Sequence, residues 1–236
     1  PPLLAPMLER LKCAVFATDL PELLEACPAV ETLGYSRFPG RRWEWPRLSA
    51  QQAGQLAEHI RSTAAAGTCR WAKTLKHVKL AGPYPPDPVL MAIAQTWKNL
   101  ETFEARVPEG APAVLARLLI ESLPRLELLD LNARDVKAEP PLAPFELRGF
   151  TPSPYCVRER LRKLWLRVAD NATFAGLSLP SLTEANLFSE SSDIRCELTA
   201  FFRAAPSLET LYLSHVKTGW PTVPSEEPLS LSLRTL

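Results

Sequence analysis

A six-residue pattern, leucine-any-any-leucine-any-leucine, recurs along this chain and constrains its fold more than any other feature. The stretch SLETLYL at 207–213 shows the pattern in full, and its three leucines define a first, a middle and a last anchor. With Val, Phe, Ala or Tyr allowed at an anchor, the copies are Val30-Leu33-Tyr35, Leu75-Val78-Leu80, Leu100-Phe103-Ala105, Leu126-Leu129-Leu131, Leu161-Leu164-Leu166, Leu182-Ala185-Leu187 and Leu208-Leu211-Leu213. A weaker copy, Leu11-Ala14-Phe16, opens the chain, and LSLRTL at its end looks like another.

The spacing of these copies indicates a structural repeat. First anchors follow one another at 25 residues (Leu75 to Leu100), 26 (Leu100 to Leu126), 21 (Leu161 to Leu182) and 26 (Leu182 to Leu208). Leucine-rich repeats have a period of about 20–29 residues. Two longer intervals of 45 and 35 residues contain proline-bearing stretches, which predicts inserted loops near 36–50 and 137–156. The longer interval could instead hide a degenerate repeat.

Strand and helix patterns alternate along the chain. Alternate residues of a strand face opposite sides, so the anchors enter a core and the residues between them face outward. Helical spacing of apolar residues is found at 49–67, 87–97, 111–124 and 191–205. A single strand–helix unit cannot cover its own apolar face, whereas stacked units can. We therefore predict an α/β fold: one leucine-rich-repeat solenoid domain over 1–236, with a parallel concave sheet and helices on the convex side. The alternative is an ordinary α/β fold with leucines in its strands.

Composition argues against several classes of function. The chain has 27 basic and 26 acidic residues, so no net field favours nucleic acid or an anionic membrane. It has no apolar run of about 18 residues, which predicts no membrane span. No glycine-rich phosphate motif or cysteine ligand spacing is present, so we expect no cofactor and no metal. The five cysteines form no regular framework, which is typical of reduced thiols in an intracellular protein, cytoplasmic or nuclear.

The turns that precede three copies share a proline two residues before the first anchor. They are EACPAVETL (25–33), ESLPRLELL (121–129) and RAAPSLETL (203–211). A proline there ends the preceding helix and favours extended geometry in the residue before it. This turn resembles that of the leucine-rich-repeat region of F-box proteins, of the fungal type, and Cys27-Pro28 reproduces its cysteine.

The resemblance implies a non-enzymatic scaffold that recognises a protein substrate for a ubiquitin ligase. Such adaptors bind Skp1 through an F-box, a three-helix module that no segment of this chain resembles. Similar repeats occur in immune receptors and GTPase-activating proteins, which are alternative classes.

Outward strand positions are the candidate binding residues. They mix both charge signs with aromatic side chains, which suits a protein partner better than a phosphate backbone. The predicted concave surface consists of His77, Lys79, Thr102, Glu104, Leu128, Asp130, Lys163, Trp165, Glu184, Asn186, Thr210 and Tyr212. Trp43 and Trp45, in the loop GRRWEWPR, are further binding candidates, because Trp and Arg are common in binding hot spots. They could equally plug the edge of the solenoid.

Three further expectations concern chemistry and chain ends. His77 and His215 lie at outward positions of two repeats, so a hydrolase or transferase that uses a histidine on the concave face is the alternative function. The basic run RERLRKLWLR (158–167) fits a strand with a charged outer face better than a nucleic-acid patch. Terminal leucines without a polar cap suggest a piece of a longer solenoid, unless GWPTVPSEEP folds back as a cap.

Overall fold

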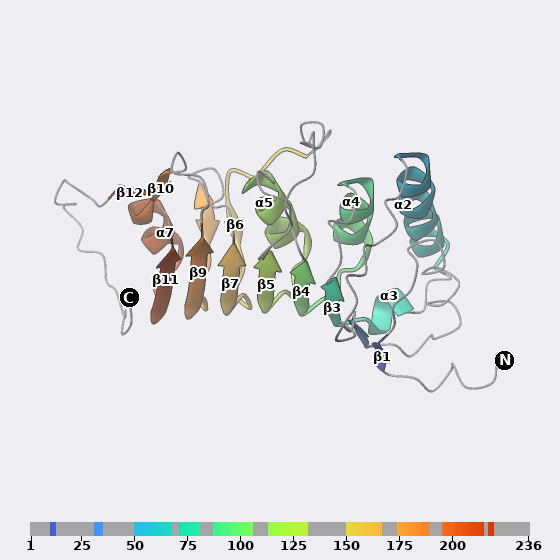
Figure 1. The fold of residues 1–236 in the computed structure, drawn as a ribbon, viewed down its shortest axis with the longest axis horizontal. Coiled ribbons are helices and arrows are strands. Elements are labelled where there is room, and N and C mark those ends of the chain that lie inside the picture. The colour runs from blue at the N-terminus through green and yellow to red at the C-terminus, as the bar shows by residue number, and fades with distance from the viewer. Residues whose placement is uncertain are drawn as a thin grey trace, which may run out of the picture. The chain divides into compact units, whose positions relative to one another are not determined.

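The computed structural model describes residues 10–12, 31–34, 50–67, 71–80, 87–105, 113–131, 150–166, 174–188, 195–214 and 217–219. The chain divides into an N-terminal unit, Pro1–Arg106, and a C-terminal unit, Val107–Leu236. Both units are α/β with parallel strands, as predicted (Figure 1). The organisation as a single domain stays a prediction. In the described parts of the chain, no helix is both long and apolar enough to cross a bilayer.

In the described part of the N-terminal unit, four parallel strands pair in chain order. They are β1 (Arg10–Lys12), β2 (Thr32–Gly34), β3 (His77–Leu80) and β4 (Thr102–Ala105). The register places Leu33 opposite Val78 and Val78 opposite Phe103, so three predicted middle anchors align. The helices of this unit are α2 (Ala50–Ala65), α3 (Trp71–Thr74) and α4 (Asp87–Thr96). Helix α2 packs against α4.

The first strand corrects the predicted register of the weak opening copy. Leu11 pairs with Leu33 and is therefore a middle anchor, whereas the sequence pattern made it a first anchor followed by Ala14. Both Leu8–Leu11 and Leu11–Ala14 have the three-residue spacing of first and middle anchors. The pattern alone could not distinguish them, but a leucine at the middle anchor offers more apolar surface than an alanine.

The helices of the N-terminal unit follow their sequence patterns. Leu56 and Ile60 of α2 are four residues apart and buried, as the helical pattern at 49–67 indicates, and Gly67, with φ of 66°, follows the helix end in the left-handed conformation common there. Helix α4 begins at Asp87, where the helical pattern begins, and Trp97 directly after it is buried. The predicted loop near 36–50 lies outside the described residues except for Ala50, which belongs to α2.

In the described part of the C-terminal unit, one set of four parallel strands also follows chain order. They are β5 (Leu128–Leu131), β7 (Lys163–Leu166), β9 (Glu184–Phe188) and β11 (Thr210–Ser214). Their register aligns the predicted middle anchors Leu129, Leu164, Ala185 and Leu211. Helices α5 (Ala113–Ser122) and α7 (Leu198–Ala204) lie on one side of these strands (Figure 1). Two short parallel pairs join β6 (Cys156–Val157) to β8 (Leu177–Ser178) and β10 (Arg195–Glu197) to β12 (Lys217–Gly219).

Two predictions fail in part within the C-terminal unit. The helical pattern at 191–205 yields a helix only from Leu198, because Arg195–Glu197 instead form β10 and pair with Lys217–Gly219. Pairing with a distant strand satisfies backbone groups that a helix would otherwise satisfy locally. The predicted loop near 137–156 ends in strand β6 at Cys156, and its residues 137–149 lie outside the described chain.

Burial confirms that the anchors form the core. The first and middle anchors of six copies are all buried: Leu75, Val78, Leu100, Phe103, Leu126, Leu129, Leu161, Leu164, Leu182, Ala185, Leu208 and Leu211. The last anchors Ala105, Leu131, Leu166 and Leu187 are buried as well, whereas Leu213 is half-buried. Strands β4 and β5 alternate between half-buried and buried residues along their length, which is the period of two that the sequence indicated.

Backbone hydrogen bonds repeat with the pattern. The N–H of a first anchor donates to the carbonyl three residues earlier, at 3.2, 3.2, 3.1 and 3.3 Å for Leu100, Leu126, Leu182 and Leu208. The residue two before a middle anchor accepts two N–H groups from the next copy. Arg162 O, for example, accepts from Thr183 at 3.0 Å and from Glu184 at 3.1 Å. Both units are therefore built from one recurring backbone turn.

Candidate functional site

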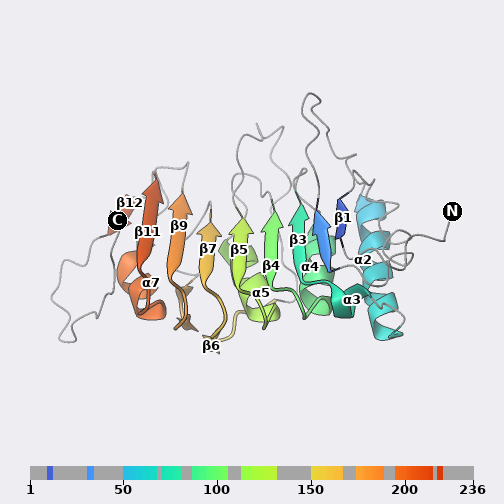
Figure 2. The same cartoon turned by 90° about the horizontal axis from the view of Figure 1, so that it is seen from below.

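The side of the strands that faces away from the helices is the candidate site in each unit, and we call it the open face. Figure 2 looks onto the strands from this side. All twelve residues predicted for the binding surface lie at outward positions, and none of them is buried. Lys79, Lys163 and Tyr212 are exposed, and the other nine are half-buried. The outward orientation of the candidate residues is thus confirmed, and their binding role stays a prediction.

The open face of the N-terminal unit pairs its polar side chains across neighbouring strands. Lys79 of β3 forms an ion pair with Glu104 of β4. His77 Nδ1 lies 3.0 Å from Thr102 Oγ1, and His77 Nε2 lies 4.0 Å from Glu101 Oε2. The described polar groups of β3 and β4 therefore satisfy one another. Ion pairs this exposed contribute at most about 1 kcal/mol each.

A further ion pair lies just before these strands. Lys76 Nζ lies 3.0 Å from Glu31 Oε1. The hydrogen bond to Glu31 and its negative charge raise the pKa of Lys76, so this lysine stays charged at neutral pH. Lys76, directly before β3, and Lys79 of β3 are thus each paired with a glutamate.

The open face of the C-terminal unit carries two rows of side chains across the four strands. The register aligns Leu128, Lys163, Glu184 and Thr210 in the first row, where Lys163 Nζ lies 2.7 Å from Glu184 Oε2. The second row, which we call the aromatic row, aligns Asp130, Trp165, Asn186 and Tyr212. The two rows place charge and aromatic surface side by side.

The aromatic row contains two large aromatic side chains. Trp165 Nε1 is buried and has no hydrogen-bond partner among the described residues. Tyr212 is 49% exposed and is one of two large hydrophobic side chains exposed in the described chain. Exposed aromatic side chains of this kind are enriched in protein-binding hot spots.

No family model and no curated protein matches this chain. Within the residues that the structure describes, no group of three His, Cys, Asp or Glu side chains could hold a metal ion. His215, Trp43 and Trp45 lie outside the described residues, so the predictions made for them stay open. The predicted binding residues that the structure does describe all lie on the open faces of the two units.

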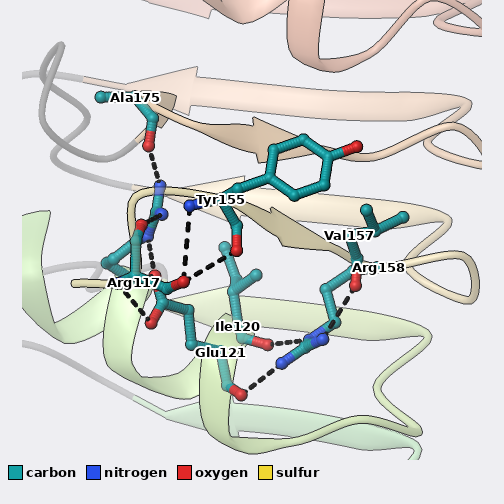
Figure 3. A network of polar contacts seen from close by, with 8 residues as sticks. Arg117, Ile120, Glu121, Tyr155, Val157, Arg158 and Ala175 are labelled. Carbon is teal, nitrogen blue, oxygen red and sulfur yellow. Dashed lines mark hydrogen bonds and ion pairs between the residues drawn. The ribbon is translucent and has the colours of Figure 1, made fainter.

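A polar network in the C-terminal unit was missed by sequence reasoning (Figure 3). Arg117 of α5 is only 1% exposed, and its Nε forms an ion pair with Glu121. Its Nη2 donates to Ser153 O at 2.7 Å, and its Nη1 donates to Ala175 O. Glu121 in turn accepts the Ser153 N–H at 3.0 and 3.1 Å. A lone arginine with a glutamate four residues later in an apolar helix was the available sequence signal.

Arg158 completes this network at the end of α5 (Figure 3). Its Nε donates to Ile120 O at 2.6 Å, and its Nη2 donates to Glu121 O. These carbonyls belong to the last helical turn, where no backbone N–H is available to them. Arg158 is therefore a structural residue at the start of the basic run 158–167, whose predicted strand begins at Lys163. Arg162 and Lys163 of that run are exposed as predicted.

Cys156 lies close to this network, where burial disfavours its thiolate form. Its side chain is buried. Burial raises the pKa of the Cys156 thiol, and the positive charge of Arg158 opposes this only in part. A thiol with a raised pKa is mostly protonated at neutral pH and reacts slowly.

Gly176 allows the segment around Pro154 to approach closely, and Gly176→Ala should be strongly destabilising. Gly176 has φ of 69°, and an added Cβ would lie 2.1 Å from Pro154 O. Gly67 has φ of 66° with open space around it, so Gly67→Ala measures the backbone strain alone. We expect about 1–2 kcal/mol of lost stability for Gly67→Ala and about 1–3 kcal/mol more for Gly176→Ala. Urea unfolding of both variants tests this, and equal losses would contradict the close contact.

Proposed function

We propose that this chain is a leucine-rich-repeat solenoid whose open face recognises a protein partner. The solenoid is supported by the aligned middle anchors and by the turn hydrogen bonds that recur in both units. Stacked repeats of this kind bury their leucines jointly and leave one strand face available for binding.

The observation that carries protein recognition is the composition of the C-terminal open face. Its two rows combine Trp165 and Tyr212 with one amide and both signs of charge. Protein-binding surfaces are enriched in aromatic side chains, whereas nucleic-acid surfaces need a surplus of lysine and arginine that these strands lack. A protein segment is therefore the ligand that fits this face best.

The proline turns support a finer proposal, that the chain is the substrate-binding region of an F-box-like adaptor of a ubiquitin ligase. Pro124 and Pro206 lie exposed in the turns that lead to Leu126 and Leu208. The adaptor would act inside the cell, in the cytoplasm or nucleus, and join Skp1 through an F-box. Purification of the intact protein from its own cells tests this. Stoichiometric Skp1 supports the adaptor, and its absence favours a receptor or GTPase-activating class instead.

Partner capture with matched variants tests recognition by the open face. The tagged chain serves as bait in a crosslinked extract, and bound proteins are quantified by mass spectrometry. Trp165→Ala combined with Tyr212→Ala should reduce the specific partner about tenfold or more, because truncated hot-spot residues cost at least about 2 kcal/mol. Tyr155→Ala is the control, since Tyr155 is 69% exposed and lies outside the open face. Equal capture by the double variant and the control would reject the proposal.

The alternative is a hydrolase or transferase that uses His77. It is favoured by the 3.0 Å distance between His77 Nδ1 and Thr102 Oγ1, with Glu101 on the other side of the ring. This order of hydroxyl, imidazole and carboxylate is the one that activates a nucleophile. A screen against ester and phosphoester substrates, repeated with Thr102→Val, distinguishes this function from recognition.

A further inference from the structure

Two hydroxyl residues, each followed by a proline, stand together in the segment 151–155 of the C-terminal unit. The chain has 24 prolines, and only Pro152 and Pro154 follow a serine or a threonine. The segment lies outside the described helices and strands, directly before β6, and all of its residues are exposed except Ser153, which is half-buried. A proline favours extended backbone in the residue before it. An exposed hydroxyl followed by proline is the substrate form that proline-directed protein kinases accept.

The fold engages the second of these hydroxyl groups. Ser153 Oγ donates a hydrogen bond to Tyr155 O at 2.7 Å and accepts the Tyr155 N–H at 3.4 Å. The Ser153 N–H donates to the Glu121 carboxylate at 3.0 and 3.1 Å, and its carbonyl accepts from Arg117 Nη2 at 2.7 Å (Figure 3). A kinase could reach this hydroxyl only after the turn and its contacts to α5 had opened.

The first hydroxyl group is available. Thr151 is exposed, and neither its side chain nor its backbone forms a hydrogen bond with another described residue. Because the contacts to α5 are made by Ser153, a kinase can bind Thr151 without breaking them. Two adjacent sites with the same local sequence pattern therefore differ in the folded chain, and the difference lies in their hydrogen bonds.

We propose that Thr151 is a phosphorylation site for a proline-directed serine/threonine kinase, and that the fold protects Ser153. In this step Thr151 Oγ forms a bond to the γ-phosphorus of ATP while the bond from that phosphorus to the bridging oxygen breaks. ADP leaves, and the hydroxyl proton passes to the catalytic carboxylate of the kinase. The product adds almost two negative charges to the surface of the C-terminal unit. This site goes beyond the proposed function and does not depend on the open face.

A comparison of the folded chain with an unfolded reference tests the proposal. The full 236-residue chain and a synthetic peptide of residues 146–158 are incubated with Mg·ATP and a purified mitogen-activated protein kinase. Mass spectrometry follows the phosphate on each hydroxyl residue over time. The peptide gives the kinase's own ratio of Thr151 to Ser153. In the folded chain this ratio should be about tenfold higher or more, since a factor of ten corresponds to about 1.4 kcal/mol, within the range of one hydrogen bond.

Three variants of the full chain make the test specific. Thr151→Val keeps the shape of the side chain without its hydroxyl, so it should reduce phosphate incorporation into this segment to about a tenth or less. Pro152→Ala should slow phosphorylation of Thr151, because a proline-directed kinase recognises the following ring. Ser153→Ala should leave the rate at Thr151 unchanged. Circular dichroism reports whether each variant is folded.

Each outcome decides the proposal. Phosphate on Thr151 of the folded chain, with a raised ratio of Thr151 to Ser153, supports it. The same ratio in the chain and the peptide would overturn protection by the fold, and an unmodified Thr151 in either of them would overturn the site. Partner capture by Trp165 and Tyr212 is measured separately, so failure of the phosphorylation site leaves the proposed function standing.

Discussion

Arg117→Met is expected to lower the free energy of unfolding by about 3–5 kcal/mol. It removes one member of a buried ion pair and leaves the carboxylate of Glu121 without its positive partner. Arg117 is 1% exposed and binds the Glu121 carboxylate together with the carbonyl groups of Ser153 and Ala175. Methionine fills similar volume without a donor, so the Glu121 carboxylate loses its positive partner and keeps only the Ser153 N–H, and two carbonyls lose a hydrogen bond. Urea unfolding followed by circular dichroism measures the loss.

A matched control and a double variant make this prediction specific. Arg125→Met removes an exposed arginine of the same unit and should change stability by less than about 0.5 kcal/mol. Arg117→Met combined with Glu121→Leu should recover part of the loss, because the buried carboxylate that lost its positive partner is then gone. A loss for Arg117→Met no larger than that for Arg125→Met would show that the network of Figure 3 does not stabilise the protein.

Leu129→Ala is expected to lower the free energy of unfolding by about 2–5 kcal/mol, because it leaves a cavity in the core. Leu129 is fully buried and is aligned with Leu164 on the neighbouring strand. Leu128, one residue earlier, faces outward and is half-buried, so Leu128→Ala should cost less than about 1 kcal/mol. The two variants remove the same atoms from adjacent positions of one strand. Equal losses in melting temperature would contradict the assigned faces.

The anchors and their register could be predicted from the sequence because both follow from a short period. Leucines at alternate strand positions must share one face, and equal spacing of copies brings equivalent anchors together in stacked repeats. Leu129, Leu164, Ala185 and Leu211 therefore align as the pattern indicated. The opening copy was displaced by three residues because Leu8, Leu11 and Ala14 offered two equivalent registers.

The sequence predicted which candidate residues face outward, but it did not predict which of them contact one another. Alternation alone placed Trp165, Asn186 and Tyr212 on one face. Which side chain neighbours which depends on strand order and on the length of the connections between strands. Lys163 and Glu184, for example, are 21 residues apart in sequence and 2.7 Å apart in space.

The sequence by itself determined the α/β class, the buried anchors and the outward residues, since each follows from a periodicity of two or of 3.6 residues within a short window. Only the tertiary structure decided that Arg195–Glu197 form a strand instead of the first turn of a helix. It also decided that Arg158 donates hydrogen bonds to carbonyl groups in the last turn of α5, and that Arg117 is buried against Ala175, 58 residues away. The physical reason is common to all three. Each depends on backbone groups that are left without local hydrogen-bond partners and are satisfied by residues distant in sequence, which no local pattern records.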